Sequence, residues 1–340
     1  MFRKQPFRIL PLLMLIPALV LSGCAPLVQP LTAVGAVPTP VIPGVEGEVD
    51  NPDIFVDPAY FLPALLQALA SHDTGNLKQW MTDPFLVGTW RATRSETSPA
   101  DALKSLYDDQ LGADIKLELV KDADLKTLMG GIDPLSIPGS ESGVMYAFLV
   151  AGWGMQGLDE AILFITMEAA DNLKWHGWLQ IKGGFSGARL GGVQPYKNDT
   201  LGFSLFVPKD YEVPDSNTQT GIFLAPGEGH PTEDRAGAIF SVEPANGRTA
   251  EQIATQLAEK TKVEMGAGYT GAAITVMDID GEPAYSVGGL PGQDVNRQLF
   301  IVHQDLLYTL MFIPDSTRAA AYSQMEDLYA MIVNTFHFIK

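Results

Sequence analysis

The stretch Ile9–Cys24, ILPLLMLIPALVLSGC, constrains this chain most, because it determines which part of the sequence is left to fold. Three basic residues precede the apolar run, and small residues precede its final cysteine. A basic N-terminal segment, a short apolar segment and small residues before the cleavage site are typical of an export signal. The alternative is a membrane-spanning helix, which needs about 20 apolar residues. The run from Ile9 to Val20 is shorter, and Pro11 and Pro17 interrupt it.

The end of this stretch, Leu21-Ser22-Gly23-Cys24, resembles the bacterial lipobox. The resemblance implies that a signal peptide, residues 1–23, is removed and that Cys24 carries the lipid as the new N-terminus. We therefore expect a palmitate-type lipid anchor that holds the protein on the extracytoplasmic face of the cell membrane. Since Ala25 is not an aspartate, the lipobox resemblance also implies delivery to the outer membrane if the host has two membranes.

Cys24 is the only cysteine in the chain. Once it is lipidated, the mature protein has no disulfide, no thiol nucleophile and no cysteine ligand for a metal. The formal charge of −18 comes without a basic stripe, which argues against a nucleic-acid partner. The histidines show no HExxH or i,i+4 pair, so we expect no metal.

Residues 24–52 are rich in proline and contain no aromatic residue. Such a segment favours extended, polyproline-like conformations and acts as a semi-rigid spacer of up to ~3.1 Å per residue. We interpret it as a tether that holds the folded part away from the membrane.

Residues 53–185 are predicted to form an α+β domain. Helical spacing comes first, and Ser98-Pro99 is typical of a helix start, which predicts a helix over 99–111. Three strands are then predicted, at 144–152, 158–168 and 173–182. Helices followed by a strand meander indicate helices packed on one curved, cone-like antiparallel sheet.

A glycine-rich joint, residues 186–195, separates this region from a second predicted domain, residues 196–340. Thr249 and Gln252 form a capping-box pattern that opens a helix to about Met265. Asp280-Gly281 predicts a hairpin turn. A final helix is predicted over 316–333, before a terminal strand.

Both domains resemble known folds. The Met81–Phe85 stretch leading into Trp90-Arg91, together with Trp175-His176-Gly177-Trp178, resembles the nuclear-transport-factor-2-like cone fold, which includes isomerases, dehydratases and non-enzymatic binding modules. The opening Tyr196–Pro208 resembles the start of PsbP-like domains, which implies an α/β sandwich that docks on other proteins.

Two motifs suggest cofactors but have simpler interpretations. Gly152–Gly157 fits GxGxxG, yet a β-branched and aromatic strand follows it where a dinucleotide site needs a helix. Asp278–Glu282 lacks the spacing of a calcium loop, so we interpret it as a hairpin turn with solvated acids. We therefore expect no cofactor.

The tryptophans suggest a binding site, because all five precede residue 186. Alternation in the last strand of the first domain places His176 and Trp178 on one face and Trp175 on the other. If the first face lines the cone, it would suit a small apolar or sugar-like ligand; the alternative is that these rings are simply core. The candidate ligand-binding residues are Trp90, Tyr146, Trp153, His176 and Trp178.

The main hypothesis is a membrane-anchored, non-catalytic lipoprotein that binds a small ligand or an envelope protein. The alternative is a small-substrate enzyme of the isomerase or hydrolase type in the cone of the first domain, with a general base such as His176. No residue is assigned a catalytic role under the main hypothesis.

Overall fold

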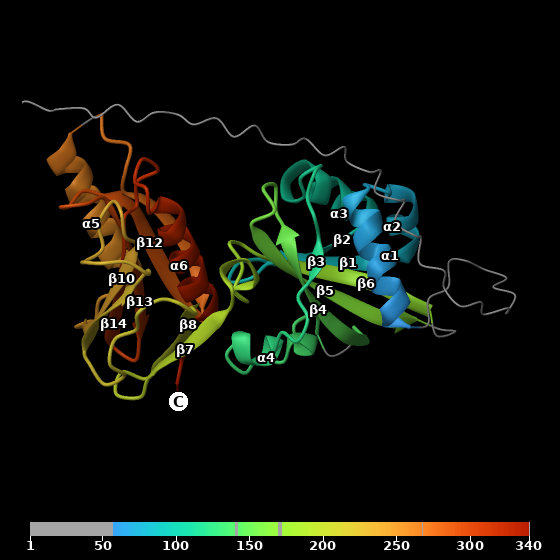
Figure 1. The fold of residues 1–340 in the computed structure, drawn as a ribbon, viewed down its shortest axis with the longest axis horizontal. Coiled ribbons are helices and arrows are strands. Elements are labelled where there is room, and N and C mark those ends of the chain that lie inside the picture. Colours follow the sequence, from blue (N-terminus) through green and yellow to red (C-terminus); the bar gives the residue numbers. More distant parts are fainter. Residues whose placement is uncertain (1–56, 140–141, 169–171, 267, 340) are drawn as a thin grey trace, which may run out of the picture. The chain divides into compact units, whose positions relative to one another are not determined.

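The computed structural model describes residues 57–139, 142–168, 172–266 and 268–339 (Figure 1). The predicted signal peptide 1–23, the predicted lipidation site Cys24 and the predicted tether 24–52 lie outside the described residues. The region Asn51–Lys340 forms one compact unit, so the predicted division of this region at 186–195 stays a prediction. Within the described ranges, no helix combines the length and the apolar character needed to cross a membrane.

Two helices begin the described chain and a third follows the first two strands; an aspartate or serine caps each of the three. They are α1 (Pro58–Ala70), α2 (Thr74–Trp80) and α3 (Pro99–Ser105). The predicted cap is confirmed, since the hydroxyl of Ser98 accepts a hydrogen bond from the Asp101 N–H at 3.2 Å. The helix predicted over 99–111 is α-helical only to Ser105 and continues as a π-helical turn, Leu106–Gln110.

The N-terminal sheet has the strand order β2-β1-β6-β5-β4-β3. Its strands are β1 (Met81–Thr89), β2 (Arg94–Thr97), β3 (Glu118–Leu119), β4 (Val144–Trp153), β5 (Asp159–Glu168) and β6 (Asn172–Ile181). The three predicted strands are confirmed as β4, β5 and β6. The sheet is not wholly antiparallel, however, because β1 runs parallel to β6. Parallel neighbours need a long connection, and the chain between β1 and β6 supplies it.

Helices cover both faces of this sheet (Figure 1). On one face, α1, α2 and α3 pack with Phe85, Trp153, Trp175 and Trp178. On the other face, the short helix α4 (Leu125–Leu128) packs with Leu149, Ile162 and Phe164, and a 3-10 turn at Pro134–Ser136 follows α4. The sheet is therefore covered on both sides.

The C-terminal part contains two sheets. Six antiparallel strands in the order β11-β12-β13-β14-β10-β9 form the larger one, and β15-β8-β7 form the smaller one. The strands are β7 (Val193–Asn198), β8 (Phe203–Pro208), β9 (Thr220–Leu224), β10 (Gly237–Pro244), β11 (Ala273–Ile279), β12 (Glu282–Leu290), β13 (Asn296–His303), β14 (Leu306–Ile313) and β15 (His337–Phe338), with a 3-10 turn at Ala188–Leu190 before β7.

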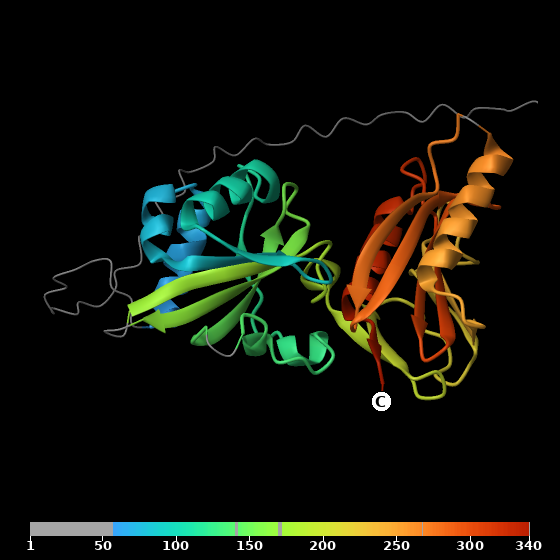
Figure 2. The same ribbon diagram turned by 180° about the vertical axis from the view of Figure 1, so that it is seen from behind.

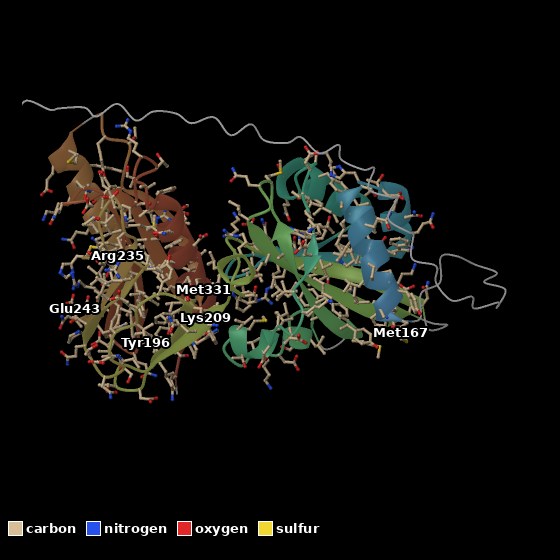
Figure 3. All side chains as sticks on the ribbon, in the orientation of Figure 1. Met167, Tyr196, Lys209, Arg235, Glu243 and Met331 are labelled. Carbon is tan, nitrogen blue, oxygen red and sulfur yellow. The ribbon has the colours of Figure 1, made fainter. Side chains whose placement is uncertain are left out.

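Helices α5 (Ala250–Met265) and α6 (Tyr322–Thr335) lie on opposite faces of the larger sheet (Figures 1 and 2). The capping box of α5 is confirmed, because Thr249 and Gln252 exchange both hydrogen bonds. The core that contains the buried side of α6 is rich in aromatic rings, and Tyr196 of β7, which Figure 3 labels, belongs to it. The predicted last helix begins later than expected, at Tyr322.

The β11–β12 hairpin turns at Asp280-Gly281, as predicted, with positive φ angles of 56° and 84° at these two residues. Strand β11 is the edge of its sheet, and Ile274 and Val276 on it are exposed. Near its end, the Asp278 N–H donates to the carbonyl of Arg91 at 2.9 Å. The hairpin therefore lies against the β1–β2 turn.

Candidate functional site

The strand that carries the predicted site is bulged at His176. In the pairing of β5 with β6, Ile165 faces Trp175 and Phe164 faces Gly177, so His176 is the extra residue. A bulge of one residue shifts the alternation that follows it. Trp175 and Trp178 consequently face the same side, toward α1–α3, and the prediction that they lie on opposite faces was wrong.

Three tryptophan rings fill the space between the sheet and these helices. Trp153, Trp175 and Trp178 are fully buried. Ring centroids are 6.1 Å apart for Trp153 and Trp178 and 5.5 Å apart for Trp175 and Trp178. The Trp178 indole donates to Oε1 of Gln110 at 2.9 Å, whereas Nε1 of Trp153 has no partner among the described residues. Trp153 and Trp178 thus act as core residues here.

The five predicted ligand-binding residues do not form one site. Tyr146 packs against the same core as Trp153 and Trp178 and stacks on Phe148, with centroids 6.0 Å apart. Trp90 belongs to the core on the opposite face of the sheet, with Phe164 and Leu179. His176 lies half-buried at the bulge.

The geometry at His176 assigns its tautomer. The Thr82 hydroxyl donates to the carbonyl of Pro84 at 2.9 Å, so its oxygen is left to accept from Nδ1–H of His176 at 3.2 Å. This arrangement leaves Nε2 as the acceptor nitrogen. Burial lowers the pKa of His176, and the nearby charge of Glu96 only partly offsets this effect. The imidazole is therefore neutral at pH 7 and able to accept a proton.

An open cavity of about 470 Å³ lies where the β1–β2 turn meets the β11–β12 hairpin. We call it the Trp90 cavity. Its lining includes four charged residues and the apolar side chains of Trp90 and Ile132; the lining residues are Trp90, Arg91, Ala92, Arg94, Ile132, Asp278, Asp280 and Gly281. Trp90 is thus the one predicted residue that lines this cavity.

Arg91 is the buried charge of the Trp90 cavity. Its side chain is only 5% exposed, and Nη1 lies 3.5 Å from the carboxylate of Asp280. Nη2 donates to the carbonyl of Phe336 at 2.7 Å, and Cζ lies 4.9 Å from the centroid of the Trp90 ring. Nε has no hydrogen-bond partner among the described residues. Burial lowers the pKa of Arg91, although Asp280 opposes this effect.

Asp280 is held by three donors. His337 Nδ1 lies 2.7 Å from Oδ1, and the Phe338 N–H donates to Oδ2 at 2.8 Å, in addition to the contact with Arg91. Burial alone would raise the pKa of Asp280, but the hydrogen bond and charge of His337, with Phe338 and Arg91, lower it overall. Asp280 is exposed, as the prediction of solvated acids requires, but its carboxylate is also held by protein donors, which that prediction did not include.

The indole of Trp90 makes a second contact, which joins the β1–β2 turn to the end of helix α6. Its Nε1 donates to the carbonyl of Asn334 at 2.9 Å. The Asn334 amide in turn donates to the carbonyls of Lys182 and Gly184 at 2.9 and 3.0 Å. The indole is therefore held in place by its edge.

A second cavity, of about 410 Å³, lies beside the β4–β5 turn and is lined by residues 113–116, Gly152 and residues 155–157. The GxGxxG stretch is confirmed as a turn between antiparallel strands, not the start of a helix. Across the described ranges, no group of three or more histidine, cysteine or acidic residues is placed to hold a metal ion.

The sequence did not predict that four charged residues line one cavity; they are Arg91, Arg94, Asp278 and Asp280. Trp90-Arg91 and Asp278–Glu282 were noticed separately, but about 190 residues separate them, and no local pattern links two turns of different sheets.

The chain was compared with known proteins. No protein-family model matches it, and the curated proteins give no match. Among solved structures it is similar to the solution structure of cyanobacterial PsbP (CyanoP) from Synechocystis sp. PCC 6803, with 15% sequence identity and a TM-score of 0.31. That similarity covers 45% of this chain and 95% of the PsbP chain. A PsbP structure is thus among the chains similar to this one.

Proposed function

We propose that this protein is an extracytoplasmic lipoprotein, anchored through Cys24, whose folded part binds a ligand or a protein partner without catalysing a reaction. The observation that carries the proposal is the contrast between two places in the fold. Tryptophan rings fill the interior behind the N-terminal sheet, whereas the open Trp90 cavity presents charged and apolar side chains together. A pocket of mixed character with few convergent polar groups suits binding.

The anchor is tested by labelling cells with palmitate. We expect label on the wild-type protein and none on Cys24→Ser, because the lipobox thiol is the attachment point. Mass spectrometry of the mature N-terminus then reports the acylated cysteine. Label that persists on Cys24→Ser, or an unmodified N-terminus upstream of Ser22, would refute the lipoprotein assignment.

The geometry at His176 favours a second candidate function, which is general-base catalysis on a small substrate. A neutral imidazole with a fixed tautomer and an available Nε2 is what a general base requires. This candidate predicts pH-dependent turnover that His176→Gln abolishes. The matched control is His230→Gln, since His230 is exposed. Equal turnover by both variants would exclude this role for His176.

A further inference from the structure

The charges of the Trp90 cavity divide into a matched pair and an unmatched pair. Arg91 and Asp280 face each other at 3.5 Å, and Asp280 has further donors in His337 and Phe338. Arg94 and Asp278 are both exposed, and neither forms an ion pair with a residue in the described ranges. Asp278 is attracted at longer range by Arg91 and accepts a hydrogen bond from the Gly281 N–H at 2.9 Å. The cavity therefore offers a ligand one cationic and one anionic group that are exposed and, among the described residues, outside any ion pair.

This combination selects against ligands with a single charge. A simple anion attracted to Arg94 would also face the carboxylates of Asp278 and Asp280, and a simple cation would face Arg91 and Arg94. Like-charge contacts of this kind reject the wrong partner, whereas complementary charges fix the orientation of the right one. A ligand that carries both charges meets neither penalty.

The remaining lining adds an apolar surface. The indole of Trp90 is held by its bond to Asn334, and Ile132 is 38% exposed although it is a large aliphatic side chain. The Nε of Arg91, on a side chain that is 95% buried, also lacks an acceptor among the described residues. A volume of about 470 Å³ lies within the range of small-molecule sites, which is roughly 300–1,000 Å³.

We propose that the Trp90 cavity binds a small zwitterion with an apolar side chain, either a free amino acid or a short peptide. Arg94 pairs with the carboxylate of the ligand, Asp278 pairs with its ammonium group, and the apolar side chain lies against Trp90 and Ile132. This inference rests on the proposed binding function, and it adds the chemical class of the ligand.

The test uses the full mature protein, purified from membranes in detergent and titrated by calorimetry with four probes. Leucine and leucyl-leucine carry both charges, leucinamide lacks the carboxylate, and N-acetylleucine lacks the ammonium group. We expect saturable binding of leucine or leucyl-leucine with a Kd below about 1 mM, and at least tenfold weaker binding of both capped probes. Comparison of the first two probes distinguishes an amino acid from a peptide.

Variants then locate the binding. Arg94→Gln and Asp278→Asn should each weaken binding of the zwitterion about tenfold or more, while Lys78→Gln and Asp109→Asn, which remove exposed charges elsewhere, leave it unchanged. Thermal unfolding of each variant checks that it is folded. The inference is overturned if neither zwitterion binds, if a capped probe binds as tightly, or if Arg94→Gln and Asp278→Asn bind as the wild type does. Mass spectrometry of the same preparation reports the anchor independently, so a failure of the ligand class is distinguishable from a failure of the proposed function.

Discussion

The substitution Asp280→Asn tests the contact that joins the β1–β2 turn to the β11–β12 hairpin. Asparagine keeps the size of the side chain and tolerates the positive φ of 56° at this position, so the change removes mainly the charge. The Arg91 guanidinium, 5% exposed, then has no counter-charge within the contact. Breaking a fully buried ion pair costs about 3–5 kcal/mol. The Asp280 side chain is 19% exposed, and asparagine can still accept from the Phe338 N–H. We therefore expect the substitution to lower the free energy of unfolding by about 2–3 kcal/mol.

The assay is equilibrium urea denaturation of the full mature chain at pH 7. Asp278→Asn is the matched control, since Asp278 lies on the same hairpin, is exposed and forms no ion pair within the described ranges. Asparagine can still accept the hydrogen bond from the Gly281 N–H, so we expect this variant to change stability by less than about 0.5 kcal/mol. A double-mutant cycle with Arg91→Leu should give a coupling of at least about 1 kcal/mol. Equal stability of Asp280→Asn and Asp278→Asn would refute the reasoning.

The same pair predicts an acid response. The pKa of Asp280 is lower in the folded protein than in the unfolded chain, so the carboxylate contributes stability that is fully present above its ordinary value of about 3.9. This stability is lost as the pH falls through the lower folded value. We expect Asp280→Asn to reduce the slope of stability against pH below about 3.9. An unchanged slope would contradict the lowered pKa.

Three further changes test other parts of the fold. Gly177→Ala places a Cβ against the carbonyl oxygen of Leu86 across the parallel pair of β1 and β6. Urea denaturation should therefore show a free energy of unfolding lower by about 1–3 kcal/mol. Wild-type stability would mean that β1 and β6 are not so closely paired. Because the pKa of His176 is lowered in the folded protein, the free energy of unfolding should fall as the pH drops below about 6.5, and His176→Gln should flatten this dependence on pH. Thr249→Ala removes the capping box of α5 and should cost about 1 kcal/mol in thermal or urea unfolding, whereas the exposed Thr270→Ala should cost much less.

Local signals in the sequence predicted local structure well. Ser98, Thr249 and Asp280-Gly281 act through hydrogen bonds or φ angles within three residues of themselves, and the structure contains each of these features. Strands β4, β5 and β6 were also located closely, because their apolar content marks them without reference to partners.

The predictions failed where the outcome depends on a partner far away in the sequence. The bulge at His176 exists only in relation to β5, so regular alternation assigned Trp175 to the wrong face. The parallel pairing of β1 with β6 likewise has no local signal. For the candidate site, the sequence indicated Trp90, but the contacts of Asp280 are with Arg91 and His337, which lie 189 and 57 residues away. The cone-like and PsbP-like assignments stay resemblances.

The position of the β1–β2 turn beside strand β11 has a consequence for solubility. An uncovered edge strand with exposed apolar residues is a template on which a second molecule can extend the sheet. Here the carbonyl of Arg91 accepts a hydrogen bond from the Asp278 N–H, which is one of the backbone donors on the open side of β11. The exposed side chains of Ile274 and Val276 lie farther along the same strand. Loosening this contact would expose a longer edge, so variants of Arg91 or Asp280 should aggregate at urea concentrations too low to unfold them.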